Sequence, residues 1–177
     1  MTTVSISSDN GNPSLAKAED RITLDLICDE SVSVPTVSFN SGLNPVNGAV
    51  TITPNSGNNT TYTATYVVDS NDTDGNVTFS VSNFQDANGN TGNTATIVTD
   101  STSVSVDTTE PTFSSITMTA NNSLDNQYAK RNRTVTLDIQ ANENINTPTV
   151  SFTSNGNPVN GSVTVSYTHL RAHETVV

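Results

Sequence analysis

The second half of the chain repeats the first. Ala16–Thr53 aligns without a gap on Ala129–Ser166, 113 residues later, with 19 of 38 positions identical. The longest identical runs are NPVNG and PTVSF, and the latter begins at Pro35 and again at Pro148. Solenoid repeats have periods of roughly 20–50 residues, so a period of this length indicates a whole small domain. The sequence therefore predicts a tandem array, which favours functions that need length or multivalency over chemistry at a single site.

Apolar residues alternate with Thr and Ser along most of the first repeat, and no stretch shows helical periodicity. The longest alternating run is TYTATYVV, Thr61–Val68. A period of two with one polar face is typical of half-buried antiparallel strands. Seven such strands are predicted between Val4 and Val106, separated by turns rich in Asn, Asp, Gly and Ser, which is the spacing of a two-sheet sandwich. We expect these residues to point into its core: Leu24, Leu26, Val37, Phe39, Tyr62, Tyr66, Val77, Phe79 and Val104.

The turn and linker sequences of this repeat are similar to those of one protein family. After TYTATYVV come DTDG (Asp72–Gly75) and DANGNTG (Asp86–Gly92), and the repeat closes with VSVDTTEPT. This succession resembles the bacterial Ig-like repeats of large surface adhesins, and the resemblance extends from Val4 to Val163. It implies an all-β fold of Ig-like antiparallel β-sandwiches in tandem. It also implies an extracellular protein, secreted or on the bacterial cell surface, that serves adhesion or biofilm formation and is not an enzyme.

We expect four segments along the chain. Residues 1–106 form a complete Ig-like repeat, 107–111 a linker, and 112–164 a second repeat that is truncated. The tail 165–177 includes VSYTHLRAHET, which resembles a translated sequencing adapter, and we exclude it from fold reasoning. Because His169 and His173 lie in this tail, their spacing is not interpreted as a zinc site.

Composition narrows the partners further. The net charge is −11, from six Lys and Arg against 17 Asp and Glu. Binding to nucleic acid needs clustered basic residues, so nucleic acid is not expected as a partner. The acidic balance favours divalent cations, although colloidal solubility accounts for part of it. The single Cys28 excludes an internal disulfide, and its place in an alternating run predicts a buried, small apolar side chain. No apolar run predicts insertion into a membrane.

Calcium is the cofactor that the acidic loops suggest, because it takes six to eight oxygen ligands from carboxylates, Asn side chains and carbonyls. In an Ig topology, Asp29 and Glu30 lie in one loop, and Asp86, Asn88 and Asn90 lie in a second loop at the same end of the domain. An alternative is that these residues only form turns, since Asn, Asp and Gly suit turn conformations.

A second group of carboxylates lies around the linker. Asp107 and Glu110 belong to the linker itself, and Glu143 lies in the first loops of the second repeat, at the position equivalent to Glu30. Asp72 and Asp74 are expected nearby, at the other end of the first repeat. We predict calcium at this junction, where it would be repeated at every domain boundary.

The sequence favours a structural role over two alternatives. Both repeats keep the core pattern, as expected for a spacer that holds a distal binding region away from the cell and whose partners are neighbouring repeats of the same chain. One alternative is a module that binds glycan or protein through its loops. The other is an accessory domain of a secreted polysaccharide-degrading enzyme.

Overall fold

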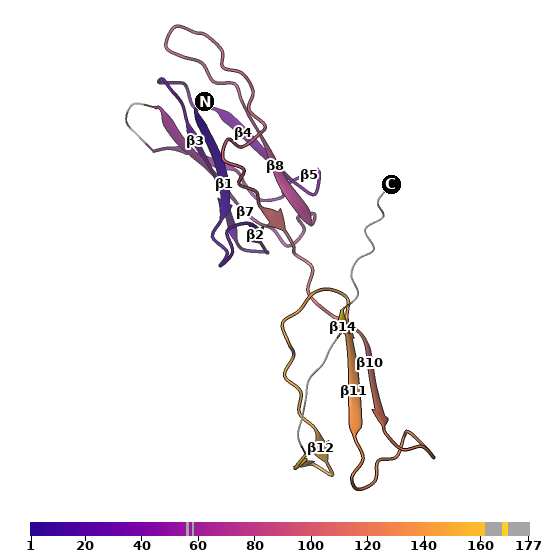
Figure 1. The fold of residues 1–177 in the computed structure, drawn as a ribbon. Coiled ribbons are helices and arrows are strands. Elements are labelled where there is room, and N and C mark those ends of the chain that lie inside the picture. The colour runs from indigo at the N-terminus through magenta and orange to yellow at the C-terminus, as the bar shows by residue number, and fades with distance from the viewer. Residues whose placement is uncertain (56, 58, 162–167, 170–177) are drawn as a thin grey trace. The chain divides into compact units, whose positions relative to one another are not determined.

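The computed structural model describes residues 1–55, 57, 59–161 and 168–169. The described part is all-β and contains no helix, which confirms the all-β part of the predicted fold class. The chain divides into two compact units, Met1–Thr109 (unit 1) and Glu110–Val177 (unit 2), and this boundary lies within the predicted linker (Figure 1). None of the described residues belongs to a helix that could cross a membrane.

One sheet of unit 1 contains four antiparallel strands in the order β1-β3-β7-β6. The strands are β1 (Thr3–Ser8), β3 (Arg21–Ile27), β7 (Thr61–Val67) and β6 (Thr51–Pro54). Their register places Leu24 of β3 between Ile6 of β1 and Ala64 of β7. All three side chains are buried, and they alternate with exposed or half-buried polar residues. The alternation in the sequence thus becomes one buried face and one solvated face.

The other sheet of unit 1 contains five strands in the order β2-β9-β8-β4-β5. The strands are β2 (Leu15–Ala16), β9 (Ser105–Val106), β8 (Gly75–Ser82), β4 (Thr36–Ser41) and β5 (Asn44–Pro45). The short pair β2–β9 is parallel, and the remaining pairs are antiparallel. The sheet therefore brings a strand near the start of unit 1 beside the strand that ends it.

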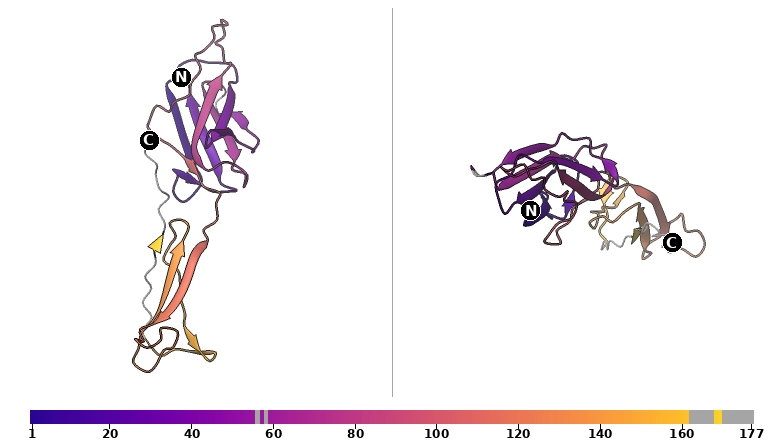
Figure 2. Two further views of the ribbon diagram at one scale, coloured as in Figure 1. Left: turned by 90° about the vertical axis from the view of Figure 1, so that its right-hand side faces the viewer. Right: turned by 90° about the horizontal axis from the view of Figure 1, so that it is seen from above.

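Side chains from both sheets form one buried cluster. The rings of Phe39 in β4 and Tyr66 in β7 lie 4.9 Å apart, centroid to centroid, and so join the two sheets. The long strands of both sheets run along the same axis of unit 1 (Figure 2). Of the residues predicted to point inward, all are buried except Val77, which is half-buried against the cluster.

The turn between β4 and β5 needs positive φ angles at both central residues. Gly42 has φ +52° and Leu43 has φ +72°, the pattern of a two-residue hairpin turn whose twist matches its strands. A Cβ at Gly42 would lie 2.4 Å from the backbone oxygen of Asp74, so glycine is required there. Leu43 is 88% exposed, and its left-handed conformation is a local cost.

Unit 2 has fewer strands among its described residues and a much smaller core. Its strands are β10 (Phe113–Ala120), β11 (Val135–Ala141), β12 (Thr153–Ser154), β13 (Asn157–Pro158) and β14 (Thr168–His169). The pairs β10–β11 and β12–β13 are antiparallel, and β14 pairs with β11 only at Gln140 and Ala141. Of the described apolar residues in unit 2, three are buried: Ala120, Ile139 and Ala141.

The repeated PTVSF run differs between the two units. In unit 1 it enters strand β4, where Phe39 is 2% exposed, whereas in unit 2 the same run forms no strand before Thr153. The predicted adapter-derived tail lies outside the described residues, apart from Thr168 and His169 in β14.

Candidate functional site

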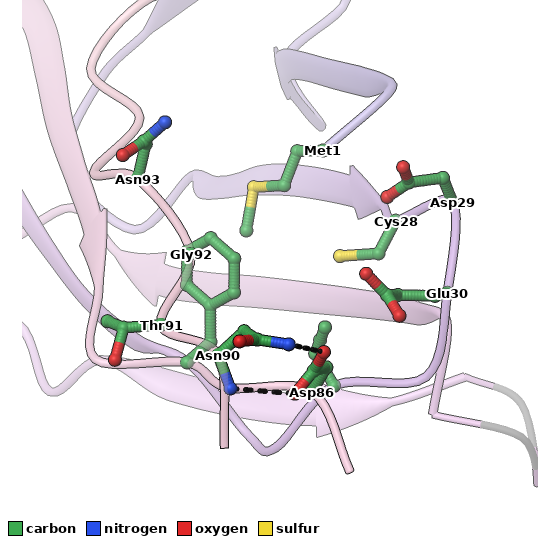
Figure 3. A pocket seen from close by; sticks show the side chains of 11 residues that line it. Met1, Cys28, Asp29, Glu30, Asp86, Asn90, Thr91, Gly92 and Asn93 are labelled. Atoms are coloured by element: carbon green, nitrogen blue, oxygen red, sulfur yellow. Dashed lines mark hydrogen bonds between the residues drawn. The ribbon is translucent and has the colours of Figure 1, made fainter. Parts of the chain in front are cut away.

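The acidic loops at one end of unit 1 surround a small hollow of about 240 Å³. One loop follows β3 and contributes Asp29 and Glu30, while another follows β8 and contributes Asp86 and Asn90 (Figure 3). The structure therefore brings four of the five residues predicted at this end around one hollow, whereas Asn88 is exposed and does not line it. The hollow is smaller than typical pockets for small-molecule ligands, which measure about 300–1,000 Å³.

Asp86 uses its carboxylate to hold its own loop. Its Oδ1 accepts hydrogen bonds from the backbone N–H of Asn88 at 2.9 Å and of Asn90 at 2.8 Å, and its Oδ2 accepts one from Asn90 Nδ2 at 2.6 Å. These bonds favour the charged form, with the Asn90 side chain as the largest cause, and lower the pKa of Asp86. The turn is therefore preformed, and the carboxylate oxygens have limited capacity left for a cation.

Glu30 and Asp29 are exposed and flank Cys28. In Figure 3 their carboxylates lie on opposite sides of the Cys28 side chain, so they do not converge on one point. The Cys28 thiol is buried, as predicted. Burial is the largest cause of its raised pKa; the N-terminal amino group acts in the opposite direction, and the Asp29 and Glu30 carboxylates add to the rise. A thiol in this state is a poor nucleophile and a poor metal ligand.

At the opposite end of the same strands, Asp72 is a buried structural carboxylate. It is 5% exposed, and its Oδ1 accepts hydrogen bonds from the backbone N–H of Asn47 at 2.7 Å and from Asn47 Nδ2 at 3.1 Å. Its Oδ2 accepts a third from the backbone N–H of Asp69 at 3.1 Å. Charge-assisted bonds of this kind compensate the burial of a carboxylate. Asp72 thereby fastens the loop before β6 to the loop before β8.

Asp74 fastens the end of unit 1. Its Oδ1 accepts hydrogen bonds from the backbone N–H of Thr108 at 2.6 Å and from the Thr108 hydroxyl at 2.9 Å, and its Oδ2 accepts one from the Thr109 hydroxyl at 2.5 Å. The backbone bond from Thr108 is the largest cause of the lowered pKa of Asp74. Sequence reasoning placed Asp74 near the linker but missed this clasp. The signal is the Thr pair directly after Asp107, because hydroxyl groups there suit a carboxylate partner.

The predicted calcium ligands around the linker are Asp107 in unit 1 and Glu110 and Glu143 in unit 2. Asp107 and Glu110 are exposed, and Asp107 Oδ1 accepts a 3.2 Å hydrogen bond from the backbone N–H of Thr109. Glu143 is half-buried, and its Oε1 is buried with no hydrogen-bond partner in the described part of the chain. Across the described residues, no three side chains of His, Cys, Asp and Glu gather closely enough to hold one metal ion. Calcium binding stays a prediction.

The chain was compared with protein families, curated proteins and solved structures, and none of them matches it.

Proposed function

We propose that the chain is a non-enzymatic structural segment of a tandem array, a spacer in a bacterial surface or secreted adhesin. In this proposal unit 1 is a complete Ig-like sandwich. The shared core of its two sheets and the parallel pairing of β2 with β9 support that assignment. The adhesin context rests on the sequence resemblance given above, and the domain repeat supports an array.

The observation that carries the proposal is the way in which the chain leaves unit 1. Asp74 binds Thr108 and Thr109, and the backbone N–H of Asp107 donates a 2.9 Å hydrogen bond to the Ala16 oxygen. A spacer needs such an attachment, because an exit segment that frayed would add length without stiffness.

Unit 2 begins almost at once after this attachment. The backbone N–H of Thr112 donates a 2.7 Å hydrogen bond to Asn142 Oδ1, so Glu110 and Pro111 alone separate residues bonded within the two units. Pro111 has a fixed φ angle and restricts the backbone of Glu110 as well. A connection this short and restricted limits the conformations available between consecutive units, as a spacer requires.

The test uses the full chain with one spin label on an exposed position of unit 1 and one on unit 2. Pulsed electron resonance then measures the distribution of distances between the two labels. We expect a narrow distribution that becomes broad when Asp74 is changed to Ala. A distribution already as broad as that of a flexible linker would refute the spacer role.

Calcium is tested in the same experiment. If Asp107, Glu110 and Glu143 bind the ion, calcium should narrow the distance distribution relative to chelator, and the melting temperature should rise by mass action. Extracellular calcium modules bind with dissociation constants of about 10⁻⁴–10⁻³ M, so the titration should extend to about 10 mM. If neither quantity changes, the calcium prediction is wrong, and the spacer proposal is judged on the distribution alone.

A further inference from the structure

Unit 1 contains three Asn-Gly pairs, which are Asn10–Gly11, Asn47–Gly48 and Asn88–Gly89. Such a pair is prone to spontaneous deamidation, because glycine has no Cβ to hinder the approach of its backbone nitrogen to the Asn side chain. Asn is for this reason counted among the thermolabile residues. Whether a pair reacts in the folded chain depends on how freely the Asn amide can turn toward that nitrogen, and the three pairs differ in this respect.

Both ends of the Asn10 amide are held. Its Nδ2 donates a 2.6 Å hydrogen bond to Asp20 Oδ2, and its Oδ1 accepts a 3.1 Å hydrogen bond from the backbone N–H of Asn12. Asp20 is fixed in turn, because the same Oδ2 accepts a 2.8 Å hydrogen bond from the backbone N–H of Lys17. Gly11 has open space where a Cβ would lie, so packing does not protect this pair and the hold on its amide does.

The Asn47 amide is held in a similar way, by the buried carboxylate of Asp72. Its Nδ2 donates to Asp72 Oδ1 at 3.1 Å and to the backbone oxygen of Asn71 at 3.0 Å. The glycine of this pair is also confined, since a Cβ at Gly48 would lie 2.3 Å from the backbone oxygen of Val67. Asn47 must therefore break a charge-assisted hydrogen bond, in a crowded place, before its side chain can turn.

The Asn88 amide has no such hold. Asn88 is exposed, and no described residue forms a hydrogen bond with its side chain, although its backbone N–H binds Asp86 Oδ1. Gly89 has φ +86° and open space around it. Its N–H is restrained, because it donates a 3.2 Å hydrogen bond to the Asp86 backbone oxygen and contributes to the lowered pKa of the Asp86 carboxylate. We expect Asn88 to react more slowly than in an unfolded chain, yet faster than Asn10 and Asn47.

We propose that Asn88 is a site of spontaneous covalent modification, which water converts to aspartate and isoaspartate. The backbone nitrogen of Gly89 attacks Cγ of Asn88, and the new C–N bond closes a succinimide ring. The Cγ–Nδ2 bond breaks, and the amide group leaves as ammonia with the proton that Gly89 gives up. Water then adds to one of the two ring carbonyls and breaks its bond to the Gly89 nitrogen. Opening at Cγ gives aspartate, whereas opening at the backbone carbonyl gives isoaspartate, in which the main chain runs through the former side chain.

The products change the loop that Asp86 holds. Asp86 Oδ1 accepts hydrogen bonds from the backbone N–H groups of both Asn88 and Asn90. Isoaspartate inserts an additional carbon into the main chain between these two N–H groups, so both bonds cannot keep their present geometry. Either product also places a carboxylate two residues from Asp86, which repels it. The modification should therefore loosen the loop 86–92, and this inference stands apart from the spacer role.

The test incubates the full chain at mildly alkaline pH, once folded and once unfolded in urea. Heavy-oxygen water marks the products formed during incubation, and peptide mapping by mass spectrometry gives the rate at each Asn-Gly pair of unit 1. In urea the three rates should agree within about threefold, because each Asn then precedes an unhindered glycine. In the folded chain, Asn88 should react at least about tenfold faster than Asn10 or Asn47, because those two must first break a hydrogen bond to a carboxylate.

Matched variants test the protective role of the carboxylate. Asp20→Ala releases the Asn10 amide beside an open Gly11, so the rate at Asn10 should rise by about tenfold while that at Asn88 stays the same. Asp100→Ala removes a carboxylate that binds only its own turn at Thr102, and it should change neither rate. Circular dichroism checks that the variants are folded. The comparison of Asn88 with the other two pairs in the unchanged chain depends on neither variant.

Hydrogen exchange measures the consequence for the loop. After incubation, the N–H groups of Asn90 and Gly92, which bind Asp86 and Phe84 in the unmodified chain, should exchange faster. Asn88→Gln is the control, because its longer side chain would have to close a larger ring and does so slowly. Its loop should keep the original protection after the same incubation.

Three results would overturn the proposal. The first is an unmodified Asn88 in the folded chain after a time in which the unfolded chain has reacted fully. The second is equal rates at Asn88, Asn10 and Asn47 in the folded chain, since the hydrogen bonds would then not decide which pair reacts. The third is a modified loop that exchanges no faster than that of Asn88→Gln, which would show that the modification leaves the loop unchanged.

Discussion

Phe39→Ala and Phe152→Ala, made separately, test how much the contribution of a Phe side chain to stability depends on the tertiary contacts around it. The two residues stand in the same local sequence. Both follow PTVS, but Phe39 is 2% exposed and its ring centroid lies 4.9 Å from that of Tyr66, whereas Phe152 is half-buried outside any strand. Removing a buried Phe side chain costs about 3–5 kcal/mol. Because small domains are stable by only about 5–15 kcal/mol, Phe39→Ala should remove a large part of the free energy of unfolding of unit 1.

The expected effect is large enough for routine measurement. A loss of 3–5 kcal/mol lowers the melting temperature of a domain of this size by about 12–20 °C, at about 4 °C per kcal/mol. Phe152→Ala should change the unfolding of unit 1 by less than about 0.5 kcal/mol. The chain has no Trp, so tyrosine fluorescence and circular dichroism during urea unfolding are suitable, and Tyr62 and Tyr66 report on the unit 1 core. A loss below about 1 kcal/mol for Phe39→Ala, or equal losses for both variants, would refute the shared core between the two sheets.

Four further predictions concern unit 1. Asp72→Ala removes a buried carboxylate that accepts hydrogen bonds from three N–H groups. The free energy of unfolding of unit 1, measured with urea, should fall by about 1–3 kcal/mol. An unchanged free energy would show that Asp72 does not hold the two loops together. Leu43→Gly introduces the residue that the second repeat has at the equivalent position, Gly156. It should raise the free energy of unfolding by up to about 1 kcal/mol, because glycine adopts a positive φ without strain. A lower free energy of unfolding would show that the Leu43 side chain makes stabilising contacts. The pKa of Asp74 is lowered in the folded state, so its contribution to stability is present above its unfolded pKa of about 3.9 and is lost as the pH falls through the lower folded pKa. The free energy of unfolding should therefore fall less steeply with decreasing pH for Asp74→Asn than for the unchanged chain. Identical pH dependence for the two would contradict this. Cys28 should react with a thiol reagent at pH 7 only at the rate of unfolding, because its thiol is buried with a raised pKa, and rapid modification of the native chain would show an accessible thiolate.

The fold class and core of unit 1 could be predicted because alternation of apolar and polar residues depends on local spacing. In the run TYTATYVV, Tyr62, Ala64 and Tyr66 recur every two residues, and a strand buries all three on one face, whereas a helix would turn Ala64 away from the two tyrosines. Turns encoded locally also persist without their surroundings. In unit 2, Asn155 and Gly156 have positive φ and connect β12 with β13, although the strand that would precede them is short.

Other features could not be read from the sequence because they depend on distant partners. PTVSF becomes a strand where β8 lies beside it and does not where β8 has no described counterpart, so identical residues have two structures. The acidic residues show the same limitation. Sequence reasoning predicted Asp86 as a calcium ligand at one end of the first repeat and placed Asp72 and Asp74 near the linker carboxylates at the other end. The structure shows each of the three engaged in hydrogen bonds that hold a loop or the exit segment. Whether a carboxylate binds a cation or holds a loop depends on the N–H and hydroxyl groups that the fold places beside it.

The parallel pairing of β2 with β9 has a mechanical consequence. When β2 is pulled from its N-terminal side and β9 from its C-terminal side, the two parallel strands slide lengthwise in opposite directions. The bonds from Ser105 to Ser14 and from Asp107 to Ala16 then carry the load together instead of opening one after another. The Asp74 clasp on Thr108 and Thr109 lies directly beyond them and shares that load. Tension that enters unit 1 from its C-terminal side therefore meets its first resistance in shear, at the exit of the domain.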